Sequence, residues 1–327
     1  MKTKVVVVIP NWNGEDMIAK ALDSLLAQSH HADIVVVDNG SIDNSVDIIK
    51  KKYKQIHLIE LPKNTGFDGG VNTGIRYALE KDYDAIAIYN NDAIADKHWL
   101  ENLVTTMESK DDLGIVSGKQ LHSDGKYFDS TGDEYTIWGM PFPRGRNILD
   151  EGQYDKSEYI FSAPAAATLF RTKMLEDIGI FDEKFFAYYE DVDISFRAQL
   201  AGWKIKYQPE AVIYHAISAT SSKLGGFTRY HATKNFFMTY TKNMPSWLYW
   251  KYLPLFLLQA LRLGISSVLR GGGIAYVKGL LMAFWYLPAT LIDRYKIQRM
   301  RRVEIKYIDK LLTHSRPPRI PTLSKDH

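Results

Sequence analysis

The chain of 327 residues is long enough to bury a sizeable core, as one large domain or two smaller ones. It contains no cysteine, which excludes disulfides, thiolate metal sites and cysteine nucleophiles. Its formal net charge of +3 is too small to indicate nucleic acid or another polyanion as a partner. The apolar run at 5–9 ends at Pro10 without a cleavage site, and no window offers the ~20 uninterrupted apolar residues of a membrane-spanning helix. We therefore expect a cytoplasmic protein.

Strand and helix patterns alternate through the first ninety residues. Residues 4–10 form a continuous β-branched run, which is typical of a strand buried on both faces. From Ile18 to Leu26, apolar residues recur at the spacing of one helical face. In chain order we expect strands at 4–10, 33–41, 56–62 and 83–92, helices at 18–26, 43–53 and 71–80, and a glycine-rich turn before the last helix. This alternation predicts right-handed βαβ units and an α/β fold with a mainly parallel sheet flanked by helices.

Polar residues follow each of these predicted strands. In such sheets ligands bind beyond the carboxyl ends of the strands, so these residues are candidates for a binding site. They are Asn11 and Asn13, Asp38 and Asn39, Asn64, and Asn90 to Asp92. Each feature also has a structural explanation, because Asp38 suits an Asx-turn, the glycine-rich stretch 64–74 a turn, and Asp92 an N-cap. A divalent cation commonly takes one or two carboxylates plus substrate phosphates, so Asp92 alone is chemically sufficient.

The alternation breaks up after about residue 110. The stretch 120–147 is rich in Gly, Asp and aromatic residues, which suits hairpins and loops better than another crossover. Helix and strand patterns return at 167–179 and 190–215. We therefore expect the second part of this domain to be built from shorter elements and longer loops.

Five carboxylates gather near the predicted start of the helix that begins at about residue 190. They are Asp182, Glu183, Glu190, Asp191 and Asp193. Acidic residues in a first helical turn ordinarily complement the helix dipole. Glu190 and Asp191, however, follow "FFAYY", and carboxylates beside aromatic surface lose solvation, which raises their pKa towards that of a general base. One of this pair is therefore a candidate catalytic residue.

Five stretches, taken together and in order, resemble one known family. They are "IPNWNGEDMIAKALDSLLAQ", "VVVDNGSIDNS", "NTGFDGGVNTG", "YNNDA" and "GIFDEKFFAYYEDVDISFRAQLAGWKIKYQPEAVIYH". Residues 4 to 240 are similar to the inverting family 2 glycosyltransferases of the GT-A fold, and most of all to their bacterial rhamnosyltransferase-like branch, which builds cell-surface polysaccharide. The resemblance implies a Rossmann-like sheet and transfer of a sugar from a nucleotide-diphosphate donor, such as dTDP-rhamnose or a UDP-hexose.

The resemblance also implies roles for individual residues. The nucleotide site would be formed by Pro10, Asn11, Asn13, Asp38, Asn64, Gly66, Asn72 and Asn91. Asp92 would bind Mn²⁺ or Mg²⁺, and His215 matches a histidine that completes the metal shell in some relatives. Asp191 matches the catalytic base, and Glu190 beside it would orient the acceptor or the base. No protein nucleophile is required, because one displacement inverts the anomeric centre.

Three residues depart from the pattern of the family. Asn90 stands at the first metal-site position in place of Asp, which makes the site less anionic. Ala165 stands where many relatives have a glycine-containing pair, and it would narrow the sugar pocket. Asp68 replaces a small residue of the glycine-rich stretch. These departures bear on donor identity more than on reaction type.

The last eighty residues differ in character from the rest of the chain. Two apolar stretches, 247–269 and 271–292, carry aromatic residues close to Lys and Arg, and a basic cluster at 294–306 follows them. We therefore predict a catalytic domain at 1–243 and an amphipathic helical extension at 244–327. The extension suits the inner face of the cell membrane, where it would bind peripherally near a lipid-linked glycan acceptor. The alternative is a homo-oligomer interface built from the same helices.

Two other function classes remain open at the level of sequence. A nucleotidyltransferase shares the parallel sheet and metal-bound phosphates, but it is expected to have a basic glycine-rich loop after the first strand, where this chain has "NWNGED". A non-catalytic protein that binds sugar nucleotides or membranes is the other alternative, if Asn90 disables the metal site. No G-x-G-x-x-G follows the first strand, which argues against a dehydrogenase.

Overall fold

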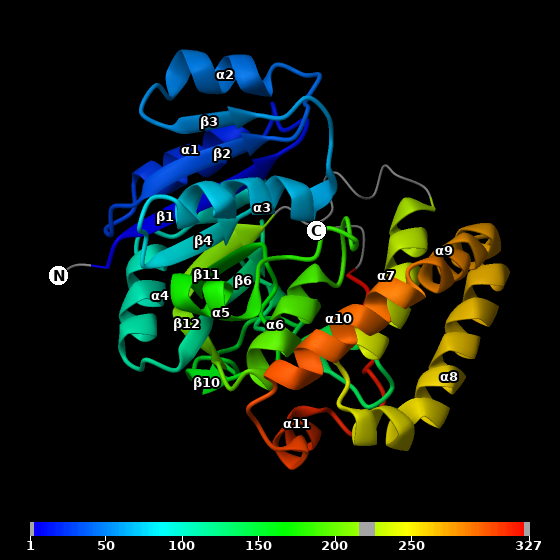
Figure 1. The fold of residues 1–327 in the computed structure, drawn as a ribbon. Coiled ribbons are helices and arrows are strands. Elements are labelled where there is room, and N and C mark those ends of the chain that lie inside the picture. The colour runs from blue at the N-terminus through cyan, green and yellow to red at the C-terminus, as the bar shows by residue number, and fades with distance from the viewer. Residues whose placement is uncertain (1–2, 216–225, 324–327) are drawn as a thin grey trace.

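The β-branched runs near the N-terminus lie side by side in one sheet (Figure 1). The structure is a computed structural model that describes residues 3–215 and 226–323. Four strands pair in parallel in the order β4-β1-β2-β3. Their bounds are β1 (Val5–Asn11), β2 (Asp33–Asp38), β3 (His57–Glu60) and β4 (Ala85–Tyr89). Side chains of β1, β2 and β4 are buried along almost their whole length, because both faces of the sheet are covered.

The sheet continues beyond β4 with mixed strand directions. β11 (Ala167–Arg171) lies antiparallel between β4 and β6 (Leu113–His122), and β12 (Lys204–His215) is parallel to β6. The shorter strands are β5 (Ala93–Ala95), β7 (Phe128–Ser130), β8 (Asp133–Tyr135), β9 (Pro141–Pro143) and β10 (Glu158–Tyr159). The carboxyl ends of β1, β4, β6 and β12 consequently meet at one edge of the sheet.

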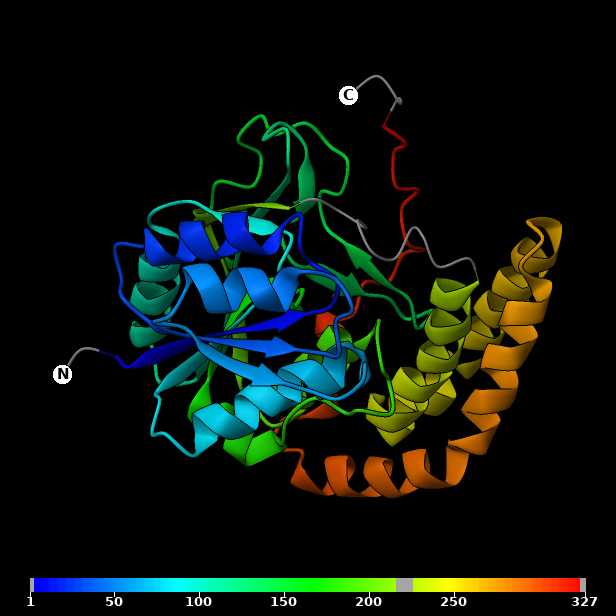
Figure 2. The same cartoon turned by 90° about the horizontal axis from the view of Figure 1, so that it is seen from above.

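Helices cover both faces of this sheet (Figure 2). One apolar core lies under α1, α2 and α4, and a second core on the other face lies under α3, α5 and α6. Their bounds are α1 (Ile18–Leu26), α2 (Ser45–Lys52), α3 (Gly66–Leu79), α4 (Trp99–Glu108), α5 (Thr172–Ile178) and α6 (Glu190–Leu200). The predicted α/β fold, with a central sheet between helices, is confirmed.

Helix α3 begins at Gly66 rather than near Val71, so the expected glycine-rich turn is the first part of a helix. The glycines let α3 approach the sheet closely. A Cβ on Gly74 would overlap the Val8 side chain of β1. Gly66 has φ +81°, and the backbone N–H of Phe67 donates a hydrogen bond of 2.7 Å to Phe186 O, which joins the helix start to the loop before α6.

Replacing Gly74 with Ala is expected to destabilise the fold by up to about 2 kcal/mol. Alanine by itself favours a helix by about 1 kcal/mol over glycine, but forcing a methyl group against buried Val8 costs about 1–3 kcal/mol. Urea unfolding of Gly74→Ala measures the difference. Gly70→Ala is the matched control in the same helix, because its nearest contact would be 3.2 Å, to Asn39. Equal stability of the two variants would contradict the proposed close approach.

In the described part of the chain five helices follow the sheet, and α7, α8 and α9 lie together beside it (Figure 2). The five helices are α7 (Phe227–Asn243), α8 (Ser246–Leu269), α9 (Gly273–Trp285), α10 (Leu287–Met300) and α11 (Ile305–Leu311). A third apolar core joins them to the rest of the protein, because Phe196 of α6 packs in the same cluster as Tyr240 and Phe256. The predicted C-terminal helical extension is present, and the division of the chain at residue 243 stays a prediction.

The C-terminal helices differ from expectation in one respect. Two helical segments, Ser246–Leu269 and Gly273–Met300, are long and apolar enough to cross a membrane by length and composition. Lys251, Arg262 and Lys278 interrupt the apolar runs, so no uninterrupted apolar window of ~20 residues exists, but the average hydropathy of both segments still reaches that of a membrane span. Core helices can meet the same criterion, but most residues of these two segments are not buried.

Candidate active site

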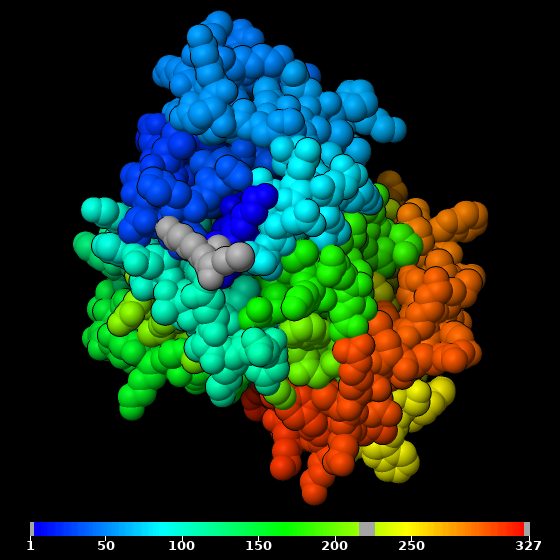
Figure 3. Space-filling view, turned by 60° about the vertical axis from the view of Figure 1, so that its left-hand side comes forward, coloured from blue at the N-terminus to red at the C-terminus, as the bar shows by residue number. Residues whose placement is uncertain are grey.

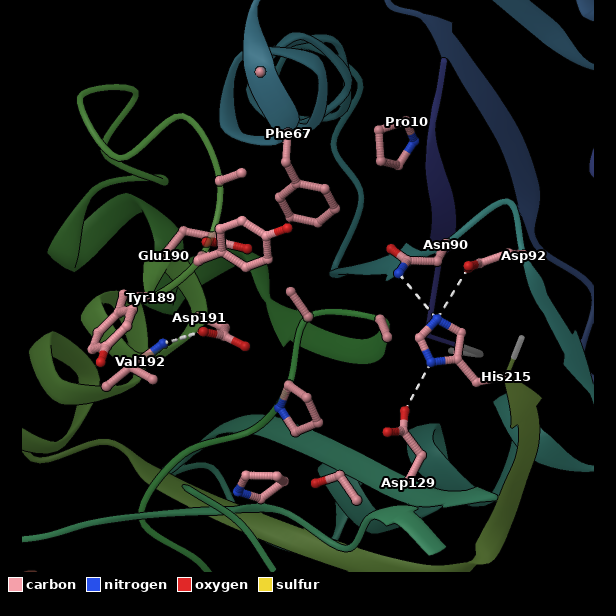
Figure 4. A pocket seen from close by; sticks show the side chains of 18 of the residues that line it. Pro10, Phe67, Asn90, Asp92, Asp129, Tyr189, Glu190, Asp191, Val192 and His215 are labelled. Atoms are coloured by element: carbon pink, nitrogen blue, oxygen red, sulfur yellow. Dashed lines mark hydrogen bonds and ion pairs between the residues drawn. The ribbon is translucent and has the colours of Figure 1, made fainter. Parts of the chain in front are cut away.

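A cavity of about 550 Å³ opens at the sheet edge where the carboxyl ends of β1, β4, β6 and β12 meet (Figure 4). It brings together most of the residues that the sequence singles out. Those that line it are Pro10, Asn11, Asn64, Gly66, Asn91, Asp92, Glu190, Asp191 and His215. Three other candidates, Asn13, Asp38 and Asn72, do not line the cavity.

The three candidates outside the cavity wall have structural partners. Asn13 Oδ1 accepts a hydrogen bond from the backbone N–H of Ile42. Asn72 Nδ2 donates a hydrogen bond of 2.9 Å to Phe181 O, and Asn72 Oδ1 accepts one of 3.1 Å from the backbone N–H of Phe181. These two bonds connect α3 to the segment before α6. Asp38 accepts the backbone N–H of Ser41 at 3.0 Å, which is the Asx-turn that its position suggested.

Asp38 nevertheless acts on the cavity through Asn11. The Asn11 side chain donates a hydrogen bond to Asp38 Oδ1 at 3.0 Å, and Asn11 Oδ1 accepts one from Asn91 Nδ2 at 2.8 Å. Asn11 is completely buried and Asp38 almost so. This chain of bonds across the ends of β1, β2 and β4 fixes the orientation of Asn91, whose amide lies at the cavity wall.

Asp92 and His215 face each other at the end of the cavity shown in Figure 4. His215 Nε2 lies 3.0 Å from Asp92 Oδ1 and 3.4 Å from Asn90 Nδ2, and His215 Nδ1 lies 2.8 Å from Asp129 Oδ2. Burial by itself lowers the pKa of His215, but its hydrogen bonds to Asp129 and Asp92 outweigh burial and raise that pKa to about 10. The imidazole thus holds a proton between two carboxylates.

The chemistry of this pair fits a divalent cation. The described residues contain no group of three or more His, Cys, Asp or Glu arranged to hold a metal. Mg²⁺, however, is usually bound by one or two carboxylates together with substrate phosphates. Asp92 offers a carboxylate oxygen, and His215 offers a nitrogen whose ring is oriented from behind by Asp129, as metal-binding histidines usually are. The cation would take the place of the proton on Nε2.

The structure separates the five carboxylates near α6 into two groups. Asp182 and Asp193 both contact Lys242 Nζ, at 2.7 and 2.9 Å, so they join α6 and its preceding segment to α7. Glu183 pairs with Arg76 at 2.6 Å. Glu190 and Asp191 have no ion-pair partner among the described residues and line the cavity. The candidate pair therefore differs from its neighbours in having no counter-charge.

Burial perturbs both members of this pair. It raises the pKa of Asp191 to about 6, although the backbone N–H groups of Val192 and Ala165 oppose the shift by donating hydrogen bonds to its carboxylate. Burial also raises the pKa of Glu190 well above its ordinary value, and the negative charges of Asp68 and Asp191 add to that shift. Asp191 is therefore mostly ionised at neutral pH, whereas burial favours the protonated form of Glu190.

The loop before α6 holds these carboxylates in a strained backbone. Phe186, Tyr188 and Tyr189 have φ between 68° and 71°, the left-handed region that costs roughly 1–2 kcal/mol per residue. Asn235 of α7, which is completely buried, donates hydrogen bonds to the carbonyl oxygens of Phe185, Ala187 and Tyr188 at 3.1, 2.8 and 2.7 Å. Helix α7 thus compensates for the strain and sets the direction in which α6 begins.

Three charged residues of the cavity were not predicted from sequence. Asp129 orients His215 and pairs with Arg146 at 3.0 Å, and Asp133 lies on the wall near Asp191. Burial raises the pKa of Asp133 to about 8, and the charge of Asp191 adds to the shift. All three come from the stretch 120–147, whose composition indicated only loops. Its concentration of Asp and Arg among glycines was the one available signal.

The fold and this site define a class of protein. The structure is similar to residues 1–349 of TarS from S. aureus, with a TM-score of 0.55, 18% identity, and 91% of this chain and 90% of that chain covered. It is also similar to the mannosyltransferase PcManGT from Pyrobaculum calidifontis in complex with GDP-Man and Mn²⁺, with a TM-score of 0.54, 15% identity and coverage of 91% and 88%. The fold is thus that of the GT-A glycosyltransferases, as predicted.

The chain belongs to glycosyl transferase family 2, whose sequence profile matches residues 6–179. It is 26% identical over 260 residues to the dTDP-rhamnosyl transferase RfbF of Shigella flexneri, covering 74% of this chain and 82% of that protein. It is 27% identical over 197 residues to the hexosyltransferase Agl10 of low-salt glycan biosynthesis in Haloferax volcanii, covering 59% and 61%. The protein is therefore a glycosyltransferase, and the resemblance seen in its sequence is confirmed.

Proposed function

We propose that the protein transfers a sugar from a nucleotide-diphosphate donor, dTDP-rhamnose or a UDP-hexose, to a hydroxyl group of a lipid-linked glycan, with inversion at the anomeric centre. The observation that carries the proposal is the placement of an unpaired carboxylate, Asp191, in the same cavity as the facing pair Asp92 and His215. The Shigella relative named as a dTDP-rhamnosyl transferase supports a rhamnosyl donor.

Each group in the cavity then has a chemical task. Asn91, oriented through Asn11, bonds the ribose of the donor, and Arg146 offers positive charge to its phosphates. Asp92 and His215 hold Mn²⁺ or Mg²⁺, which when bound supplies positive charge for the departing nucleoside diphosphate. Asp191 accepts the proton of the acceptor hydroxyl. The hydroxyl oxygen bonds to the anomeric carbon of the donor sugar at the same time, and the bond from that carbon to the donor phosphate breaks on the opposite side. Ionised Asp191 suits this task, whereas Glu190 beside it, whose protonated form burial favours, would donate a hydrogen bond to the acceptor.

Titration calorimetry with UDP-, dTDP- and GDP-sugars, with and without Mn²⁺, tests this proposal most directly. One nucleotide is expected to bind in a metal-dependent manner. Incubation of that donor with membrane glycolipid extract should then yield a product of opposite anomeric configuration, which NMR coupling constants identify. Nucleotide binding without turnover on any acceptor would favour a non-catalytic protein instead.

The pH dependence of transfer should follow the ionisation of Asp191. Because the base acts in its deprotonated form and its pKa is raised to about 6, the rate is expected to fall about tenfold per pH unit below pH 6 and to level off above it. Initial rates at saturating donor, measured from pH 4.5 to 8, give the profile. A rate that stays constant down to pH 5 would show that another group takes the proton.

We further propose that residues 1–243 form the catalytic domain and that 244–327 bind peripherally to the inner face of the membrane. Most of the large apolar side chains that are exposed on this protein lie on α8, α9 and α10. Among them Trp250 and Trp285 are 69% and 79% exposed. In Figure 3 the orange residues of this region lie on an outer flank, away from the blue N-terminal strands. The exposed Leu291 and Ile292 of α10 suit an interfacial position, and Arg294 of the same helix donates a hydrogen bond to the backbone of α7.

Vesicle sedimentation checks the membrane proposal. The protein is expected to bind vesicles that contain anionic phosphatidylglycerol, and replacing Trp247, Trp250 and Trp285 together by Ser should weaken binding more than tenfold, because burying one such side chain contributes about 1.5–3 kcal/mol. Tyr159→Ser is the matched control, since Tyr159 is 50% exposed but lies outside the C-terminal helices. The membrane role would be refuted if the protein did not bind vesicles and instead dimerised through these tryptophans.

A further inference from the structure

A second cavity, of about 520 Å³, lies among the C-terminal helices and is also lined by Met140 and Tyr189. Helices α7, α8 and α9 supply most of its wall, and two arginines, Arg229 and Arg270, line it. The other polar groups of the wall are the hydroxyls of Thr228, Thr233, Ser266, Ser267 and Tyr276. No carboxylate is among the described residues that line it. Guanidinium and hydroxyl donors without an acidic group are suited to bind phosphate.

The surrounding chain leaves these two arginines without counter-charges. Between Glu210 and Asp293 the sequence contains no Asp or Glu, but it contains eight Lys and Arg residues, of which Lys242 and Lys251 form ion pairs with carboxylates from outside this stretch. Within the described ranges, the ion pairs formed by arginine involve other residues, Arg76, Arg144, Arg146, Arg197 and Arg302. Arg229 Nε lies only 2.5 Å from the position that a Cβ on Gly272 would occupy, so the arginine packs against the start of α9. An anion in the cavity would offset the positive charge of Arg229 and Arg270.

The second cavity is adjacent to the first. Tyr189, which precedes Glu190 and Asp191, lines both. The Tyr188 hydroxyl lies 3.0 Å from Thr228 Oγ1, which joins a residue of the first cavity to one of the second. One molecule can therefore place a sugar hydroxyl at Asp191 and an anionic group at the arginines.

Exposed apolar surface begins where the second cavity ends. Val268 and Leu269, directly before Arg270, are 66% and 81% exposed, and Ile274 at the start of α9 is 76% exposed. A hydrocarbon chain attached to an anion in the cavity would lie against this surface and the membrane beside it. A soluble anion would make no use of it.

We propose that the second cavity binds the phosphate or diphosphate that joins the acceptor glycan to its lipid, with Arg229 and Arg270 as the ligands of that group. The inference rests on the proposed function, and it specifies how the acceptor is recognised. The lipid follows the exposed side chains of α8 and α9, and the glycan extends past Tyr189 towards Asp191.

Titration of the full chain with citronellyl diphosphate, a short isoprenoid diphosphate, tests this site without any sugar donor. EDTA is present so that the probe does not bind through a metal at Asp92. Citronellyl diphosphate is expected to bind at least tenfold more tightly than inorganic pyrophosphate, and citronellol alone is expected to bind weakly. If pyrophosphate binds as tightly as the lipid, the cavity is a site for a free anion and the lipid assignment is wrong.

Variants then locate the binding. Arg270→Gln and Arg229→Gln should each weaken binding of citronellyl diphosphate at least tenfold, because each removes a charged hydrogen-bond donor to the diphosphate. Lys278 is exposed on α9 and does not line the cavity, so Lys278→Gln removes an equal positive charge and should bind citronellyl diphosphate as the wild type does. Arg270 is exposed, so its replacement leaves the fold intact even if Arg229→Gln disturbs packing. Unchanged binding in Arg270→Gln and Arg229→Gln would overturn the proposal, whereas failure of every nucleotide sugar to bind would overturn only the proposed function.

Discussion

Replacing Asp191 by Asn is expected to lower kcat for sugar transfer by about 10³-fold while leaving the affinity for the donor unchanged. A positioned general base contributes about 10²–10⁴-fold to such a rate, and the amide cannot accept the proton of the acceptor hydroxyl. Asn keeps the shape of the side chain and an oxygen that accepts the N–H groups of Val192 and Ala165. Initial rates at saturating donor give kcat, and calorimetry gives the donor affinity.

Two further variants make this result specific. Glu190→Gln should change kcat by less than tenfold, because burial favours the protonated form of Glu190 and Gln resembles that neutral form. Asp111→Asn removes an exposed carboxylate after α4 and serves as the matched control. If Glu190→Gln were inactive and Asp191→Asn retained a tenth of the wild-type rate, the two roles would have to be exchanged.

Replacing Asp92 by Ala is expected to abolish the metal dependence of donor binding and to weaken binding of the nucleotide sugar in Mn²⁺ about a hundredfold or more. Altering even the residues behind metal ligands commonly costs 10–100-fold in affinity, and Asp92 supplies the only carboxylate oxygen that faces His215 Nε2 in the described part of the chain. Calorimetry with the preferred donor, with and without Mn²⁺, measures the effect.

Companion variants distinguish a metal site from a purely structural pair. Asp129→Asn keeps Asp92 in place but removes the carboxylate that orients His215, so it should weaken metal-dependent binding by about tenfold, less than Asp92→Ala does. Asp111→Ala is the control for the loss of a surface carboxylate. Donor binding that stays equally strong in Mn²⁺ and in EDTA for the wild type would refute the assignment of Asp92 and His215 as metal ligands.

The sequence was least informative about helix starts and about segments that pair at long range. The glycine-rich stretch at 64–74 reads as a turn, because isolated glycines disfavour helices by about 1 kcal/mol each. In the folded protein these glycines lie in the first part of α3. The Val8 side chain occupies the space that a Cβ at residue 74 would need, and this close contact with β1 compensates for the lower helix propensity of glycine. Tertiary packing thus overrode a local preference.

The sequence by itself determined the order of the first strands and helices, because buried β-branched runs and apolar helical faces depend on local spacing. It also determined that Asn11, Asn91 and Asp92 lie at one edge, since parallel strands share the direction of their carboxyl ends. The pair of Glu190 and Asp191 was visible from the aromatic residues that precede it.

Only the tertiary structure decided which groups meet in the cavity. His215 reaches Asp92 because β12 pairs antiparallel with β5, in a register that sets His215 opposite Ala93. Asp129 reaches His215 from β7, which pairs with β6. The selection of Asp191 over its acidic neighbours depends on Lys242, which lies on α7 and contacts Asp182 and Asp193. Such pairings join residues far apart in the chain, and local spacing carries no information about them.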